Sequence, residues 1–448
     1  MIQRAPSTSP PPRRPRPRRA PWLGLFAAGL GLRLVCAALV PAPDSALVSD
    51  ASRVDAIARS LARGDGFALP SAGGSKPTAS SPPLAPWLLG MDYGVFGTRT
   101  MTAALLWCLI GALTPILVGW MGASLFGSPV GRIAGWVSAL DPLLVLRGPS
   151  LAQQSVLGAA LVLALGLSAA WLKTPRRGRA LGLGLAWGWC ALASVVALPI
   201  PLVVIGWAWV PLGLTVPPGE RRRQIGLIAL GATLVVLPWT ARNAIVLRAA
   251  APVTTSAGVA LLAGNNADVW DTPALRGGAL DVLAREPYAG RLASLPEGER
   301  DRRAAWSALQ FLSGRLRDWP AVAMARLARL WDPRWEREEA AARAPSSRGA
   351  GRPPGAIDPV MAASLLLFPL GLWGAARAFV GQRRWFQALP VLVLAYFAAV
   401  AAAFFGMQRD RVPVEPLLVL LSSLGLEDLR RRLRVRRRGL RLVERRAV

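Results

Sequence analysis

Ten apolar stretches, most of them about 20 residues long, run through this chain of 448 residues. A helix needs roughly 20 apolar residues to cross a hydrocarbon core of about 30 Å. We therefore predict an all-α polytopic membrane protein, because a soluble domain of this length would not carry so many such stretches. The predicted spans are residues 21–40, 100–121, 131–147, 150–172, 180–198, 199–216, 225–240, 359–380, 386–405 and 413–429.

Arginine-rich segments fall on alternate connections between these spans. Cytoplasmic connections of membrane proteins carry an excess of Lys and Arg, so this alternation predicts that both termini are cytoplasmic. The predicted cytoplasmic segments are the leader 1–20, the connections 122–130, 173–179, 217–224 and 381–385, and the tail 430–448. All of them except 122–130 are dense in arginine.

The formal net charge is +28, with no histidine. In a soluble protein this balance would suggest nucleic-acid binding, but here the arginines lie beside apolar spans. We interpret the basic leader, expected to be disordered, and the basic tail as anchors beside anionic lipid, and predict no nucleic-acid partner. The three cysteines lie inside apolar spans, where a thiol behaves as a small hydrophobe, so neither a disulfide framework nor a metal cluster is indicated. They are Cys36, Cys108 and Cys190.

Two outward connections are long and polar. The first, 41–99, is acidic and rich in Pro and Gly, and the second, 241–358, contains helical periodicity at 297–317 and 320–331. Such amphipathic helices commonly lie at the membrane interface. The predicted organisation is a transmembrane module with its first outer loop (41–99), an outer region with a linker, and a closing set of transmembrane helices. These parts cover residues 21–240, 241–358 with the linker at 340–356, and 359–429.

The most specific local pattern begins just after the first span, in the sequence SDASRVDAIARSLARGDGF of residues 49–67. Apolar residues recur at i, i+3, i+4 and i+7, which predicts an amphipathic helix that ends at Gly64. Asp50 stands at the start of this helix on the predicted outer face. Asp55, Arg59 and Arg63 are spaced for i,i+4 pairs on a solvated helix face.

These residues resemble the first outer loop of the GT-C membrane glycosyltransferases, and most closely that of glycosyltransferase family 39, which contains protein O-mannosyltransferases and aminoarabinose transferases. Further similar motifs follow in the family's order. They are PWTARN at 238–243, GNNAD at 264–268, the amphipathic segment 316–331, and QRDRVP followed by Glu415-Pro416 at 408–416.

The resemblance implies a GT-C-like bundle and transfer of a sugar from a polyprenyl-phosphate donor to a lipid, glycan or protein acceptor on the outer face. In that family a carboxylate of the first outer loop activates the acceptor hydroxyl, and Asp50 occupies the matching position. Fixed cations must also stabilise the departing phosphate. The predicted residues for donor phosphate and sugar are Arg53, Lys76, Arg242, Asn243, Asn265, Asn266, Arg409 and Arg411.

Several of these residues also have a structural interpretation. Asp50 could cap its helix, and Arg242 could be an anchor at the end of a span. Asn265 and Asn266 could cap a turn in which Gly264 supplies backbone freedom. Arg409 and Arg411 lie outward against the charge rule, which favours phosphate binding for Arg411.

The sequence departs from the family pattern at several positions. Val54 replaces an aromatic residue, Ser80 and Ser81 stand where a cation often precedes the prolines, and Gln153 or Gln154 stands in place of an acidic residue. The lost carboxylate and the lack of histidine argue against a divalent metal cofactor, because hard cations prefer carboxylate oxygen.

Two hypotheses remain at the sequence level. The first is a hexosyl- or pentosyl-type glycosyltransferase in a bacterial inner membrane, since dominance of arginine over lysine is typical of GC-rich genomes. The alternative is a non-catalytic multi-pass protein, either a degenerate transferase scaffold or a transporter. A transporter should place charged or broken helices near the midplane of the bilayer. Asp141, which precedes Pro142 inside an apolar span, is an intramembrane ionisable group and hence a candidate functional residue.

Overall fold

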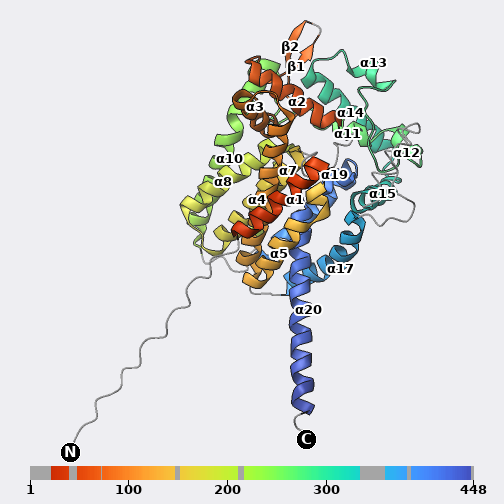
Figure 1. Ribbon diagram of the computed structural model, residues 1–448. Coiled ribbons are helices and arrows are strands. Elements are labelled where there is room, and N and C mark those ends of the chain that lie inside the picture. The colour runs from red at the N-terminus through yellow and green to blue at the C-terminus, as the bar shows by residue number, and fades with distance from the viewer. Residues whose placement is uncertain are drawn as a thin grey trace, which may run out of the picture.

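The computed structural model describes residues 22–39, 48–71, 73–146, 152–209, 216–332, 359–380 and 385–444, with only the backbone at 48–51, 152 and 437–444. The described part is an almost entirely helical bundle (Figure 1). The predicted leader 1–20 and linker 340–356 lie outside the described residues.

Each of the ten predicted spans coincides with a helix or a pair of helices. They are α1 (Trp22–Leu39), α4 (Thr100–Phe126), α5 (Ser128–Leu140) with α6 (Pro142–Leu146), α7 (Ala152–Lys173), α8 (Arg177–Ala193), α9 (Ile200–Trp209), α10 (Pro218–Leu247), α17 (Pro359–Val380), α18 (Leu389–Ala403) and α20 (Glu415–Glu444). Two short 3₁₀ turns, η1 (Val195–Ala197) and η2 (Trp385–Ala388), precede α9 and α18.

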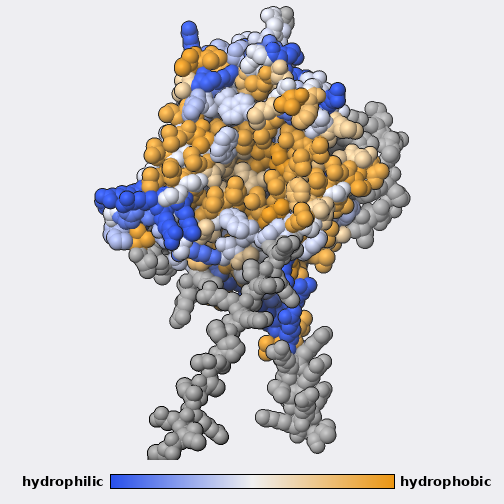
Figure 2. Space-filling view, turned by 60° about the vertical axis from the view of Figure 1, so that its left-hand side comes forward, coloured by the Kyte–Doolittle hydropathy of each residue, from blue (hydrophilic) through white to orange (hydrophobic). Residues whose placement is uncertain are grey.

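Six helical segments of the described chain are long and apolar enough to cross a membrane, namely α1, α4, α7 from Gln153, α10, α17 and η2 with α18. The predicted span 131–147 differs most from expectation, because it is broken between α5 and α6 at Asp141 and Pro142. A proline cannot donate a backbone hydrogen bond, so it begins a new helix there. Figure 2 shows a broad apolar band across the face in view, with hydrophilic groups above and below it, as expected of a multi-pass membrane protein.

Small residues let the spanning helices pack closely. A Cβ atom added at Gly184 of α8 would lie 2.2 Å from the Ile228 carbonyl of α10, and one at Gly231 would lie 2.7 Å from the Leu181 carbonyl. These two helices therefore approach backbone to backbone, as small residues allow in membranes. Nearby, the buried Trp171 indole donates a 2.7 Å hydrogen bond to Gln224 and so ties α7 to α10.

The remaining elements belong to the two outer connections. The first contains α2 (Val48–Arg63), the hairpin strands β1 (Ala68–Ser71) and β2 (Gly74–Pro77), and α3 (Leu84–Phe96). The second contains α11 (Ala257–Gly264), α12 (Ala267–Asp271), α13 (Tyr288–Leu292), α14 (Glu297–Gly314) and α15 (Trp319–Trp331), and the short α19 (Gln408–Arg411) precedes α20.

Both outer connections lie at the same end of the bundle, opposite the end from which α20 projects (Figure 1). Contacts agree with this arrangement. At one end of α10, Arg242 bonds to the first outer loop, whereas Glu220 at the other end pairs with Arg177 at the start of α8. The two long connections therefore lie at one end of the bundle, as predicted, while the assignment of either end to the cytoplasm stays a prediction.

Candidate functional site

The first outer loop begins with the predicted amphipathic helix. α2 buries Val54, Ile57 and Ala58, so its apolar stripe is confirmed. Asp50 is the third residue of α2 and lies inside the first turn, with only its backbone described. A carboxylate at a helix N-terminus is favoured by the helix dipole, whether it serves as a cap or as a base.

The charged face of α2 has the predicted i,i+4 pair. Arg59 Nε lies 2.7 Å from Asp55 Oδ2, and the Tyr93 hydroxyl donates a 2.5 Å hydrogen bond to Asp55 Oδ1. Asp55 therefore joins α2 to α3. Arg53, one turn after the helix start, is half-buried, whereas Lys76 is exposed on β2.

Arg242 reaches from the end of α10 into the first outer loop. Its guanidinium donates to the Thr78 carbonyl at 2.7 Å and to the Phe67 carbonyl at 2.9 Å, and it lies over the rings of Phe67 and Trp239. Asn243 is fully buried and donates to the Ala251 carbonyl. Both side chains thus make polar contacts with the protein, which supports a positioning role for the PWTARN motif.

Glu297, the first residue of α14, binds the same loop and interacts electrostatically with Arg242. Its carboxylate accepts hydrogen bonds from the Thr78 hydroxyl at 2.6 Å, the Ala79 amide at 3.0 Å and the Thr255 hydroxyl at 2.8 Å. Sequence reasoning missed this residue, because an acid in the first turn of a helix is commonplace. The available signal was the acid's position at the start of a strongly amphipathic helix in the second outer connection.

The motif at 264–268 lies at a junction of three helices, α11, α15 and α18. Asn265 donates to the Leu261 and Ala403 carbonyls, and Asn266 caps α12 by accepting from the Val269 amide. Capping by Asn266 is therefore confirmed. Gly264 has a role other than backbone freedom, since a Cβ there would lie 1.9 Å from the Phe404 carbonyl.

Arg326 of α15 connects the three helices of this junction. This residue was not identified from the sequence. It is fully buried and donates to the carbonyls of Ala402, Ala403 and Gly264 and to Asn265 Oδ1, at 2.7 to 3.0 Å. Burial lowers the pKa of Arg326 to about 10, which leaves it protonated at neutral pH.

Arg411 is buried beside the start of α20. Its guanidinium forms two hydrogen bonds with the Glu415 carboxylate, at 2.5 and 2.6 Å, and one with Ser364 at 3.1 Å. It also lies over the ring of Phe368, 4.7 Å from the centroid. The neighbouring Arg409 is half-buried, with its Nε atom 3.9 Å from Asp410 Oδ1.

Two further buried charges lie close to this pair. Asp141 is 3% exposed, accepts from the Leu144 amide at 3.0 Å, and interacts electrostatically with Glu415 and Arg411. Arg33 of α1 is 1% exposed, donates only to the Gly29 carbonyl among the described residues, and interacts electrostatically with Asp141. Buried charges are costly unless paired, so this group from α1, the α5–α6 break and α19–α20 is a candidate functional feature.

A narrow pocket adjoins this group. Arg33, Thr114, Gln154 and Ser155 contribute its polar lining. Gln154 is one of the residues that replace a family-typical acidic residue. This replacement therefore lies in the pocket beside the buried charges.

The predicted site residues thus fall into separate sets of contacts. Arg242 and Asn243 bond to the first outer loop and its surroundings, Asn265 and Asn266 to the junction of α11, α15 and α18, and Arg411 to α17 and α20. In the described part of the chain, no three His, Cys, Asp or Glu residues are grouped so that they could hold a metal ion.

No family model matches the chain, and no curated protein matches its sequence. Solved structures do match. The apo oligosaccharyltransferase of Archaeoglobus fulgidus aligns with 94% of this chain at 12% identity and a TM-score of 0.55. The archaeal oligosaccharyltransferase AglB from the same organism, in complex with an inhibitory peptide and a dolichol-phosphate, aligns with 93% at 13% identity and a TM-score of 0.55.

The chain spans about half the length of these proteins, 52% and 51%. ArnT from Cupriavidus metallidurans, bound to undecaprenyl phosphate, aligns with 91% of this chain and 78% of its own at 17% identity and a TM-score of 0.44. The likeness to the oligosaccharyltransferase shows that this chain has the GT-C fold that the sequence motifs predicted.

Proposed function

We propose that this protein is an integral-membrane glycosyltransferase that moves a sugar from a polyprenyl-phosphate donor to an acceptor on the outer face of the membrane. The observation that carries the proposal is the GT-C fold over nearly the whole chain. Fold does not fix function, so the second support is local. The Asp50 helix and the 67–79 hairpin region occupy the outer end, where Arg242 and Glu297 hold the hairpin region from two sides.

In the proposed reaction Asp50 is the general base. The acceptor hydroxyl loses its proton to the Asp50 carboxylate as its oxygen forms a bond to the anomeric carbon. The bond between that carbon and the phosphate oxygen breaks, and the phosphate leaves with the electron pair. A lipid phosphate carries its own negative charge, so nearby cations must stabilise it as it leaves.

We assign the donor phosphate to Arg53, Lys76 and Arg409. Lys76 is exposed, and Arg53 and Arg409 are partly buried. Arg411 remains a proposed contributor, although its charge is balanced by Glu415. Four other predicted residues remain proposed neighbours of the substrate: Arg242, Asn243, Asn265 and Asn266. Their contacts with the protein support a role in positioning the outer segments. The acceptor is a lipid, glycan or protein.

The proposed location is the inner membrane of a bacterium, with both termini cytoplasmic. Cysteine labelling tests the orientation. In a variant whose native cysteines are replaced by alanine, Ser75→Cys on the exposed hairpin should react with an impermeant maleimide in intact cells, and Arg436→Cys on α20 should not. The reverse labelling pattern would exclude Asp50 as an outer-face base.

Activity is tested by deleting the gene and comparing glycolipids and glycans by mass spectrometry. We expect loss of one sugar from an acceptor and accumulation of the polyprenyl-phosphate sugar. The wild type and Asp65→Asn should restore the acceptor, whereas Asp50→Asn should not despite equal expression. Asp65 is a suitable control because it is an exposed carboxylate of the same loop that bonds to Arg63 and Ser75. Restoration by Asp50→Asn would refute the assigned base, and an unchanged profile on deletion would favour the non-catalytic alternative.

A further inference from the structure

Two acidic residues of helix α14 face the interior of the outer region. Glu297 and Asp301 lie on the inward face with the buried Ala304 and Ala308. Asp301 Oδ1 accepts hydrogen bonds from the Gly258 and Val259 amides at 2.7 and 3.0 Å, and Glu297 bonds to the first outer loop. Both inward carboxylates are therefore occupied by protein groups.

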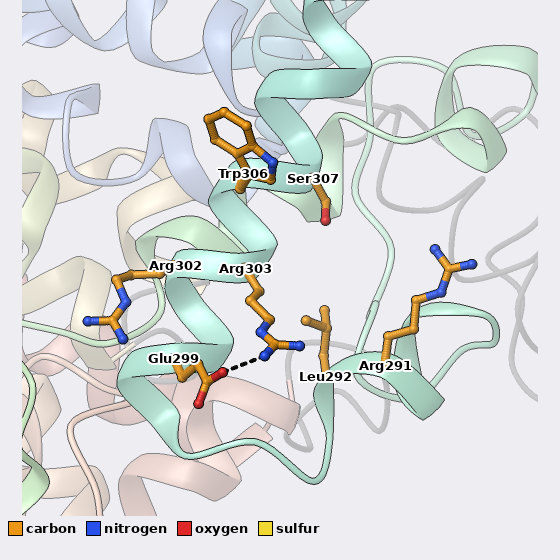
Figure 3. Close-up of a pocket in the computed structure, with 7 residues that line it drawn as sticks. All are labelled: Arg291, Leu292, Glu299, Arg302, Arg303, Trp306 and Ser307. Atoms are coloured by element: carbon orange, nitrogen blue, oxygen red, sulfur yellow. Dashed lines mark hydrogen bonds and ion pairs between the residues drawn. The ribbon is translucent and has the colours of Figure 1, made fainter.

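The opposite face of α14 forms the floor of a pocket. Its residues recur at i, i+3, i+4, i+7 and i+8, which places them on one side of the helix. They are Glu299, Arg302, Arg303, Trp306 and Ser307. Arg291 and Leu292 of α13 form the facing wall of this pocket, whose volume is about 610 Å³ (Figure 3). This size lies in the range typical of small-ligand sites.

The pocket is strongly basic. It has three arginines and one carboxylate, and that carboxylate, Glu299, already pairs with Arg303 at 2.6 Å. Arg302 and Arg303 extend to either side of α14, and Arg291 lies across from Arg303 and Ser307 (Figure 3). A guanidinium binds carboxylate and phosphate oxygens in a planar fork, so the excess charge selects an anion.

Trp306 adds an aromatic surface to this charge. Its side chain is 64% exposed, which is unusual for the largest apolar residue unless it meets a ligand, a partner or a membrane. The flat indole offers a large apolar contact and a polar N–H, a combination that suits a sugar ring with one apolar face and hydroxyls at its edge. α13 and α14 lie at the same end of the bundle as the hairpin, so the pocket faces the proposed acceptor side (Figure 1).

We propose that the α13–α14 pocket binds an anionic saccharide through Arg291, Arg302 and Arg303, with Trp306 against the sugar ring. The pocket itself is independent of catalysis. That the saccharide is an acceptor glycan rests on the proposed function.

Binding is measured on the full chain reconstituted in phosphatidylcholine nanodiscs, with trigalacturonate as the anionic probe and maltotriose as the neutral one. We expect trigalacturonate to bind at least tenfold more tightly than maltotriose, and less tightly as salt is raised, because exposed charges are screened. Asp50→Asn should bind trigalacturonate as the wild type does. Trigalacturonate binding by a wild type that transfers no sugar would mean that the proposed function fails while the pocket stands.

The variant Arg291→Gln/Arg303→Gln should weaken trigalacturonate binding about tenfold, in line with loss of charge-assisted hydrogen bonds. Its matched control is Arg248→Gln/Arg285→Gln, which removes the same charge from exposed positions of the second outer connection outside the pocket. This control should stay within about twofold of the wild type, since distant exposed charges are screened. Trp306→Leu should weaken trigalacturonate binding several-fold and leave binding of inorganic phosphate unchanged.

Three results would overturn the proposal. Equal binding of maltotriose would show that charge is not selected, and equal weakening by the control variant would show a diffuse charge effect. Competition by phosphatidylglycerol in the nanodisc, with no preference for a saccharide over inorganic phosphate, would assign the pocket to a lipid headgroup.

Discussion

Glu297 Oε1 accepts a 2.6 Å hydrogen bond from the hydroxyl of Thr78, a residue 219 positions earlier in the chain. This contact joins the two long outer connections. On the other side of Thr78, its carbonyl accepts from Arg242. The first outer loop is therefore fixed between a carboxylate and a guanidinium, although it lies at the surface of the bundle.

Glu297→Ala should loosen that loop. It removes three hydrogen bonds to a charged acceptor, and we expect a loss of about 3 kcal/mol of stability, since bonds to charged groups contribute about 1.5–3 kcal/mol each and do not add fully. Thermal unfolding in detergent and faster hydrogen exchange at residues 67–79 would report it. Glu299→Ala, on the exposed face of the same helix, should cost at most about 1 kcal/mol. Equal effects of the two variants would contradict the role of Glu297.

The Arg411–Glu415 pair should be intolerant of losing one partner. Both side chains are 1% exposed, so Glu415→Ala removes the hydrogen-bonded partner of a buried guanidinium and should cost about 3–5 kcal/mol. The double variant Arg411→Met/Glu415→Leu removes both charges and should recover most of the stability. The yield and the melting temperature in detergent are measured for the single and the double variant. Asp271→Ala, which breaks the exposed pair with Arg315, is the control. A double variant less stable than Glu415→Ala would argue against this account.

Arg326→Lys should open the junction of α11, α15 and α18. A lysine ammonium lacks the planar fork that lets Arg326 reach three carbonyls and Asn265, so about 2 kcal/mol should be lost. Hydrogen exchange at 261–266 and 400–406 should rise selectively. Arg317→Lys, at an exposed position between α14 and α15, should change neither segment. Protection that persists in Arg326→Lys would show that packing alone holds the junction.

Two aspartates should respond to pH with opposite signs. Burial raises the pKa of Asp301 above 3.8, so the folded state binds its proton first, and the wild type should gain stability relative to Asp301→Asn as pH falls through the raised value. The hydrogen bond from Arg63 lowers the pKa of Asp65 below 3.8. The advantage of the wild type over Asp65→Asn should therefore be full above about pH 4 and lost as pH falls through the lowered value. Melting temperatures measured from pH 7 to 3 test both, and slopes of the same sign would refute the assignment.

The sequence predicted the helices well because their signals are local. Apolar length located ten helical segments, of which six are long and apolar enough to cross a membrane, and i,i+3,i+4 periodicity located α2, α14 and α15. The sequence showed an ionisable residue, Asp141, followed by a proline. The span 131–147 was nevertheless predicted as one continuous helix. Here the missing backbone donor of Pro142 outweighs the apolar composition around it.

The candidate site was less predictable because its contacts join distant segments. Arg242 and Asn265 were identified by motif, yet their partners, Thr78 and Arg326, could not be inferred from spacing. Glu297 resembles any acid in a first helical turn, and only the fold brings it to the first outer loop. Tertiary pairing of this kind leaves no periodic trace in the sequence.

The rigid geometry of α14 has a mechanical consequence. One face of this helix binds Thr78 and Ala79 of the first outer loop through Glu297. The other face carries the arginines of the pocket. Because both sets of groups lie on one continuous helix, a ligand on the outer face would contact the same element that holds the first outer loop. One helix therefore carries both the groups proposed to bind a saccharide and the carboxylate that holds Thr78 and Ala79.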